Sequence, residues 1–166
     1  MNNKIKRPRQ EETHSEFDEK VLYVNRCSKV VKGGRKFSFS ALVIVGDGHG
    51  RIGFGFAKAN EVSDAIRKGG EAARKNIMHF EMEGTTIPHE IKVDWDGATV
   101  FLKPAVEGTG VIAGSKVRSV LELGGVKDVV AKIYGSNNPL NQVRATLQAL
   151  LGLRNREKVL KNRGLI

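Results

Sequence analysis

The sequence predicts an α+β protein made of two small domains, and three observations lead to this prediction. Two early stretches, 21–24 and 37–45, are apolar runs of the kind found in β-strands, and phenylalanine alternates with serine over 37–40. Later stretches instead place apolar residues at helical spacing. A short segment at 81–89 contains a glycine, a proline and acids, and 166 residues are enough for a small domain on each side of it.

The first domain is expected over residues 20–80 as three strands followed by one helix, a βββα module. The third strand places its apolar residues on one face, and Gly53 and Gly55 leave the other face flat for a close neighbour. The helix has acids in its first turn and bases near its end, as the helix dipole favours. The expected elements are strands at 21–24, 37–45 and 51–57, a turn at 46–50, and a helix over 62–80.

The second domain is expected over residues 90–152, where two paired strands lead into a helix, a strand and a helix. This order implies parallel or mixed strand pairing. Ser115 is the expected cap of the first helix, and Asn138-Pro139 is a cap with proline at the first helical position of the second. The expected elements are strands at 91–93, 99–103 and 126–133, a loop at 107–110, and helices that end at 124–125 and at 152.

The two ends of the chain differ in composition from the domains. Residues 1–19 are polar, of mixed charge, and contain Pro8, so a flexible tail is expected there. Residues 153–166 are expected to form a basic tail. The single cysteine, Cys27, excludes an intramolecular disulfide, and no apolar run reaches the length of a membrane span. A cytoplasmic protein is the simplest expectation.

The charge of the chain points to a polyanionic partner. The formal net charge is +10, and the isoelectric point is about 9.9. Much of the excess is concentrated in residues 25–36, which contain five basic residues and no acidic one. We interpret this stretch as a basic tip between two strands, hinged by Gly33 and Gly34, which would serve positive φ or close packing. The alternative is a solvated basic hairpin without a partner. The basic residues are Arg26, Lys29, Lys32, Arg35 and Lys36.

No short motif in the chain predicts an enzyme. Residues 48–53 match G-x-G-x-x-G, but a strand follows where dinucleotide binding needs a helix, so we interpret them as a hairpin turn. The four histidines are scattered, and no metal, cofactor or small-molecule substrate is expected. The loops at 107–110 and 135–138 are open to two readings, as phosphate-binding loops or as plain turns with helix caps.

Three long blocks of the chain carry a resemblance to known proteins: VNRCSKVVKGGRKFSFSALVIVGDGHGRIGFGFAKANEV (24–62), AIRKGGEAARKN (65–76) and FLKPAVEGTGVIAGSKVRSVLELGGVKDVVAKIYGSNNPLNQVRATLQAL (101–150). Together they resemble one family, the fifth protein of the bacterial small ribosomal subunit. The resemblance implies a first domain similar to the double-stranded-RNA-binding fold and a second, βαβα domain with a left-handed crossover, against the usual right-handed rule.

The same resemblance implies a structural, non-enzymatic protein of the 30S subunit that binds 16S ribosomal RNA. It implies contacts with the fourth and eighth small-subunit proteins, a part in head-to-body geometry, and an influence on translational accuracy. The 25–36 loop would reach toward the head, and the 107–118 segment would face the fourth protein or RNA near the messenger entry. Besides the basic stretch with Gly33 and Gly34, the expected RNA-binding residues are Arg51, Lys58, Lys103, Gly108, Thr109, Gly110, Lys116, Arg118, Ser136, Asn137 and Arg144.

Two other functions stay open on the residues alone. An RNA-processing or nucleotide-using enzyme could share the second fold, and Glu107 is the one carboxylate in a glycine-rich loop that could serve it. A free-standing double-stranded-RNA-binding protein would also carry a basic hairpin on this fold.

Overall fold

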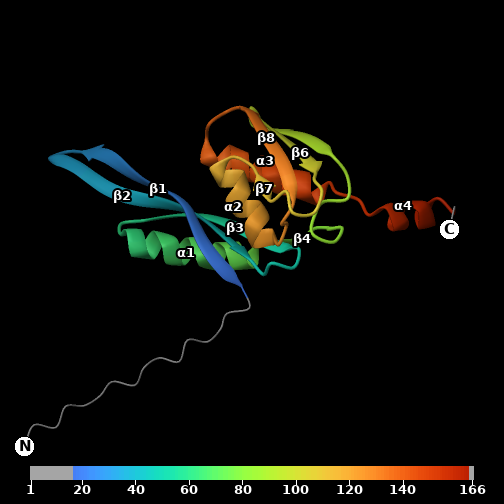
Figure 1. Cartoon of the computed structure of the whole chain (residues 1–166). Helices are drawn as coiled ribbons and strands as arrows, with labels where there is room; N and C mark the ends of the chain where they lie inside the picture. Colours follow the sequence, from blue (N-terminus) through green and yellow to red (C-terminus); the bar gives the residue numbers. More distant parts are fainter. Residues whose placement is uncertain (1–16, 165–166) are drawn as a thin grey trace, which may run out of the picture.

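The computed structural model describes residues 17–164, so most of the predicted N-terminal tail lies outside the described residues. The α+β class is confirmed, with two sheets and helices that pack between and beside them (Figure 1). None of the helices in this range is long and apolar enough to cross a membrane. In chain order the elements are β1 (Asp18–Val31), β2 (Gly34–Gly46), β3 (Arg51–Ala59), α1 (Val62–Lys75), β4 (Ile77–His79), β5 (Ile91–Trp95), β6 (Ala98–Pro104), β7 (Val111–Ile112), α2 (Ser115–Gly124), β8 (Val129–Gly135), α3 (Pro139–Leu151) and α4 (Arg156–Asn162).

The first sheet is antiparallel throughout, in the order β1-β2-β3-β4, and α1 covers one of its faces. The flat face predicted for β3 is the face that α1 occupies. A β-carbon on Gly53 would lie 2.3 Å from the carbonyl oxygen of Ala73, and one on Gly55 would lie 2.0 Å from that of Gly69. The helix backbone therefore rests directly on the strand, and only glycine allows this approach.

The helix of the first domain is shorter than predicted. The prediction of a helix over 62–80 is wrong beyond Lys75, because 77–79 form β4. Ile77 pairs with Gly53 and Met78 pairs with Ile52, which covers the edge of β3 that would otherwise be open. Apolar residues at 77 and 80 continue the helical spacing, so the periodicity alone did not separate the two structures.

The second sheet has the order β5-β6-β8-β7, and its pairing is mixed, as predicted. The pair β7 and β8 is parallel, and α2 connects the two strands; the other pairs are antiparallel. The two-residue strand β7 was not expected. The expected strand at 126–133 begins only at Val129, because the N–H of Val126 closes the end of α2 on the carbonyl of Leu121 at 3.0 Å. Gly114 rather than Ser115 is the N-cap of α2.

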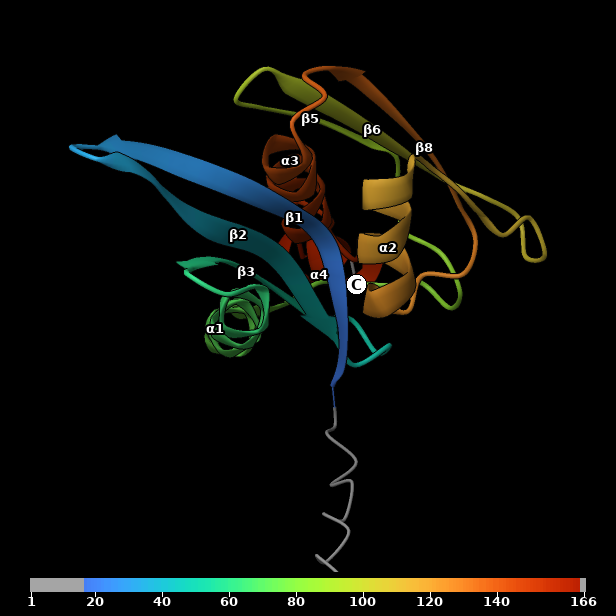
Figure 2. The same cartoon turned by 90° about the vertical axis from the view of Figure 1, so that its left-hand side faces the viewer.

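The two sheets share one hydrophobic core. Figure 2 shows four layers, in which the first sheet lies between α1 on one side and α2 and α3 on the other, and the second sheet lies beyond α2 and α3. Ile87, in the connecting segment 81–89, is 1% exposed and belongs to the same core. The core residues from the first sheet are Leu42, Ile44 and Ile52, and those from the second half include Val100, Leu102, Val117, Leu121, Val143 and Leu150.

Main-chain contacts join the 46–50 turn to the C-terminal end of α2. The N–H of Gly48 donates to the carbonyl of Leu123 at 3.0 Å, and the N–H of Gly50 donates to the carbonyl of Gly124 at 2.9 Å. A β-carbon on Gly46 would lie 2.2 Å from the oxygen of Leu123. The turn thus satisfies carbonyl groups that a helix end leaves without an intrahelical partner, and it does so across the boundary between the two sheets.

We expect Gly46→Ala to destabilise the whole protein by about 1–3 kcal/mol, because the added methyl group overpacks a backbone contact that cannot rotate away. Urea unfolding would measure this loss. The matched control is Gly152→Ala, at a helical backbone position where the new methyl group meets mainly the flexible end of the Ile91 side chain, 2.8 Å away. Equal unfolding midpoints for Gly46→Ala and the wild type would contradict the role assigned to this contact.

Candidate nucleic-acid interface

The basic stretch 25–36 forms the outer part of one long hairpin rather than a hinged loop. Strands β1 and β2 stay paired up to Val31 and Gly34, so only Lys32 and Gly33 form the turn. The prediction of short strands joined by a long tip is therefore corrected. Figure 1 shows the hairpin projecting well beyond α1 and the rest of the protein.

The strand register distributes the basic side chains over both faces of this hairpin. Lys29 lies directly opposite Lys36, so these two ammonium groups share one face. Arg35 lies opposite Val30 on the other face, which by alternation also carries Arg26. The guanidinium carbon of Arg26 lies 4.3 Å from the centroid of the Phe37 ring on that face.

The charge of the hairpin is uncompensated within the described part of the chain. All five basic residues of the stretch are exposed, and none of them belongs to an ion pair among residues 17–164. Like charges directly opposite one another, such as Lys29 and Lys36, are unfavourable in an antiparallel pair. An external polyanion would relieve this repulsion, and nucleic-acid phosphate is the polyanion that basic surfaces most commonly meet.

The two glycines at the tip serve backbone conformation rather than close packing. Gly33 has a φ of +102° and Gly34 a φ of +152°, and β-carbons built on them would meet no atom within 4 Å. Of the two explanations that the sequence left open, positive φ is therefore the one that applies. The open space beside both glycines also leaves the tip accessible to a partner.

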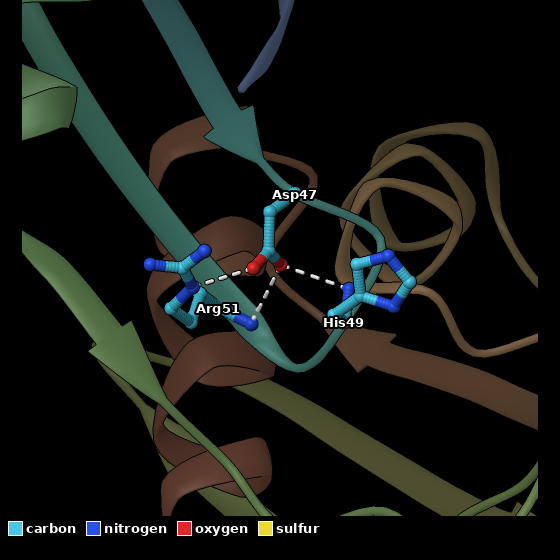
Figure 3. Close-up of polar contacts among 3 residues, drawn as sticks. All are labelled: Asp47, His49 and Arg51. Carbon is cyan, nitrogen blue, oxygen red and sulfur yellow. Dashed lines mark hydrogen bonds and ion pairs between the residues drawn. The ribbon is translucent and has the colours of Figure 1, made fainter. Parts of the chain in front are cut away.

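Arg51, an expected RNA-binding residue, is engaged within its own turn (Figure 3). Its Nε lies 2.5 Å from Oδ2 of Asp47, while Oδ1 of Asp47 accepts the N–H groups of His49 at 2.8 Å and of Arg51 at 3.0 Å. Burial by itself would raise the pKa of Asp47, but these hydrogen bonds outweigh it and lower that pKa. The G-x-G-x-x-G match is thus a hairpin turn, as predicted, and the charge of Arg51 is partly neutralised.

Two other expected residues hold the domains together. The ammonium group of Lys116 donates to the carbonyl of Leu22 at 3.0 Å and lies 5.4 Å from the Tyr23 ring centroid, at the base of the hairpin. The guanidinium carbon of Arg144 lies 5.8 Å from the Phe54 ring centroid. Neither side chain is freely exposed. By contrast, the side chains of three expected residues are exposed and form no ion pair in the described range: Lys58, Lys103 and Arg118.

The 107–110 loop is organised by a buried carboxylate that sequence reasoning missed. Oδ1 of Asp128 accepts the N–H of Gly108 at 3.0 Å and of Gly110 at 2.9 Å, and the residue is only 4% exposed. The N–H of Gly110, followed by the Thr85 hydroxyl, holds the pKa of Asp128 below its usual value, although burial alone would raise it. These N–H groups already have an anionic partner, which favours the plain-turn interpretation of the loop.

The second glycine-containing loop is a helix cap. The side chain of Asn138 accepts the N–H of Leu140 at 3.2 Å, which confirms the predicted cap of α3. Ser136 accepts the N–H of Asn138 at 3.2 Å through its hydroxyl oxygen, while Asn137 is exposed. Among residues 17–164, no three His, Cys, Asp or Glu side chains come together as a metal site would require.

We expect Asp128→Asn to destabilise the protein at neutral pH and to change its acid response. The lowered pKa means that the ionised carboxylate stabilises the fold above its unfolded pKa of about 3.9, and that this contribution is lost as the pH falls through the folded value. The difference in stability between wild type and variant should therefore be constant from about pH 7 to about pH 5 and should shrink as the pH falls below about 4. Urea unfolding at a series of pH values would measure it.

The control for this prediction is Glu107→Gln, which removes a negative charge from the same exposed loop. It should leave both the stability and its pH dependence near those of the wild type. A constant stability difference for Asp128→Asn across the pH series would show that the hydrogen bonds do not depend on the charge.

Comparisons with known proteins agree with this architecture. Residues 17–81 match the family described as "Ribosomal protein S5, N-terminal domain", and residues 93–163 match "Ribosomal protein S5, C-terminal domain". The "Small ribosomal subunit protein uS5" of Protochlamydia amoebophila is 66% identical over 163 residues, which cover 98% of each chain. The protein of the same name from Chlamydia abortus is 66% identical over 89% of this chain and 90% of its own length. The chain belongs to the ribosomal protein S5 family.

Proposed function

We propose that this protein is a structural component of the small ribosomal subunit, where its basic hairpin binds 16S ribosomal RNA. Membership of the ribosomal protein S5 family makes it a structural protein rather than an enzyme. The observation that carries the assignment of the RNA contact is the projecting hairpin, whose five basic residues are exposed and form no ion pair among residues 17–164. No observation favours an RNA-processing or nucleotide-using enzyme.

The hairpin is suited to contact two segments of RNA backbone at once. Lys29 and Lys36 lie on one face, Arg26 and Arg35 on the other, and Lys32 at the tip between them. A two-stranded ribbon charged on both faces can lie between two phosphate chains and neutralise both. This geometry supports a role in holding the head of the subunit relative to its body, and through that geometry in translational accuracy.

The other segments of the chain also have proposed roles. Residues 20–80 would form the RNA-binding domain, 81–89 the connection, and 90–152 the second domain, with 153–166 as a basic tail. The 107–118 segment, with exposed Arg118, would face the fourth small-subunit protein or RNA near the messenger entry. The eighth small-subunit protein would be the second protein neighbour, and the ribosome would place the chain in the cytoplasm.

Substitution of Lys29, Lys32, Arg35 and Lys36 by glutamine should weaken binding to a 16S RNA fragment and reduce its salt dependence. Each lost phosphate contact should lower the slope of log affinity against log salt by about 0.7–0.9. Stability should be nearly unchanged, because all four side chains are exposed. Filter binding at several salt concentrations measures the slope.

The control for the hairpin variant carries four glutamines at exposed lysines elsewhere: Lys68, Lys75, Lys127 and Lys161. If both variants lose the same slope, RNA binding depends on total charge and the hairpin is not the specific contact.

Gly33→Ala should impair incorporation of the protein into the small subunit without unfolding the protein. A non-glycine residue in the left-handed region costs about 1–2 kcal/mol, and this strain can be relieved by a change in the turn. All five positive charges remain but the tip points elsewhere, so incorporation into reconstituted subunits should fall while thermal stability and nonspecific RNA affinity stay close to wild type. Normal incorporation would mean that the shape of the turn is unimportant.

A further inference from the structure

The second sheet has an outer face that no described element covers. One face of β5, β6 and β8 packs on α2 and α3 through buried residues such as Val100, Leu102 and Val129. The alternate residues of the same strands point the other way, to the outside of the outermost layer in Figure 2. This outer face consists of Lys92, Asp94, Thr99, Phe101, Lys103, Val130, Lys132 and Tyr134.

Two aromatic side chains lie on adjacent strands of this face. Tyr134 is 54% exposed, and it pairs with Thr99, two residues from the half-buried Phe101. Diagonal neighbours of this kind have β-carbons within about 7–8 Å of each other. A shallow hollow on this surface is lined by Lys92, Thr99, Phe101 and Tyr134. The two rings therefore belong to one continuous surface, with the hollow between them.

Lysines surround these rings. Phe101 pairs with Lys92 on one neighbouring strand and with Lys132 on the other, and Lys103 lies further along β6 on the same face. All three lysines are exposed, and none forms an ion pair within residues 17–164. The one carboxylate of the face, Asp94, accepts a hydrogen bond from the Thr99 hydroxyl. The net charge of the face is thus positive.

We propose that this outer face binds single-stranded RNA, with bases stacked on Phe101 and Tyr134 and phosphates neutralised by Lys92, Lys103 and Lys132. Exposed aromatic rings on an open sheet provide flat surfaces for unpaired bases, which can turn out of the strand, whereas the bases of a duplex stay stacked on one another. The separation of the rings suits two nearby bases. The lysines on both sides of the rings can neutralise the phosphate groups that link those bases. A protein partner would leave three unpaired ammonium groups to be neutralised, which makes it the less favoured occupant.

This proposal rests on the proposed function only in that both concern RNA. The hairpin carries its charge on a two-stranded ribbon, whereas the outer face combines charge with stacking and lies on the other domain. The two surfaces therefore predict different ligands and different responses to substitution, and either can be wrong without the other.

The test uses the full chain with the four hairpin glutamine substitutions as background, so that hairpin binding does not mask the outer face. The probe is fluorescein-labelled octauridylate, followed by fluorescence anisotropy. Phe101→Leu with Tyr134→Leu should weaken binding about tenfold or more, because base–aromatic contacts are lost, while the salt slope stays unchanged. Lys92→Gln with Lys132→Gln should instead lower the slope by about 1.4, at about 0.7 for each single-strand contact.

Controls separate stacking from general effects on the protein. Phe56→Leu removes an aromatic ring that is 52% exposed on the first sheet, and it should not change octauridylate affinity. Tyr134→Leu alone retains half-buried Phe101 and provides a folded variant if the double substitution destabilises the domain. A duplex of the same length should bind more weakly than octauridylate and should be insensitive to the leucine substitutions.

Photocrosslinking with 5-iodouridine in the octauridylate should place the bases on peptides that contain Phe101 or Tyr134. The proposal is overturned if the leucine variants bind octauridylate as the background does, or if the crosslinks map to other peptides. It is also overturned if octauridylate binding is unaffected while the leucine variants fail to enter reconstituted subunits, since that result would assign the outer face to a protein neighbour. If one of these results overturns the proposal for the outer face, the assignment of the hairpin still stands, because that assignment is tested separately by the salt slope on the 16S fragment.

Discussion

The structure depends on the main-chain contact between the 46–50 turn and the end of α2. Two N–H groups of the turn between β2 and β3 donate to two carbonyl groups of α2, the helix that lies between the two sheets. The contact needs bare backbone on both sides, since a β-carbon on Gly125 would lie 2.0 Å from the carbonyl oxygen of Gly48. Because backbone groups have fixed positions, the turn defines how the two sheets are oriented, whereas the shared apolar core supplies most of the stabilising buried surface.

The contact between the 46–50 turn and α2, which we call the junction, also fixes the direction in which the hairpin projects. Strand β2 contributes Leu42 and Ile44 to the core that the junction closes, and the same strand continues without interruption to Gly34 at the tip. Lys116 of α2 adds a second attachment by bonding to the carbonyl of Leu22 in β1. The base of the ribbon is thus held from the second domain as well as the first, so the charged end is presented at a defined angle.

Local patterns in the sequence predicted the longer strands, the first three helices and the hairpin charge, because alternation, helical spacing and runs of like charge are properties of neighbouring residues. They did not predict the contacts that join distant segments. The glycines at 46, 48 and 50 were correctly predicted to form a turn, but their partner lies more than seventy residues away along the chain. Asp128 was missed for the same reason, since the N–H groups that donate hydrogen bonds to it belong to a loop some twenty residues earlier in the chain. The end of α1 was misplaced because β4 forms only when the edge of β3 is available.

The residues that stabilise the fold are different from the hairpin residues that are proposed to bind RNA. None of residues 25–37 is buried, although β1 and β2 pair along this whole length. The free energy of folding therefore comes from the inner ends of the strands and from the second domain, so changes in charge at the outer end leave the core intact. Phosphate contacts of this kind position a protein but do not read bases. A hairpin that positions the protein in this way would leave any recognition of unpaired bases to a different surface. The sheet of the second domain supplies one exposed ring, Tyr134, and one half-buried ring, Phe101, on a rigid support.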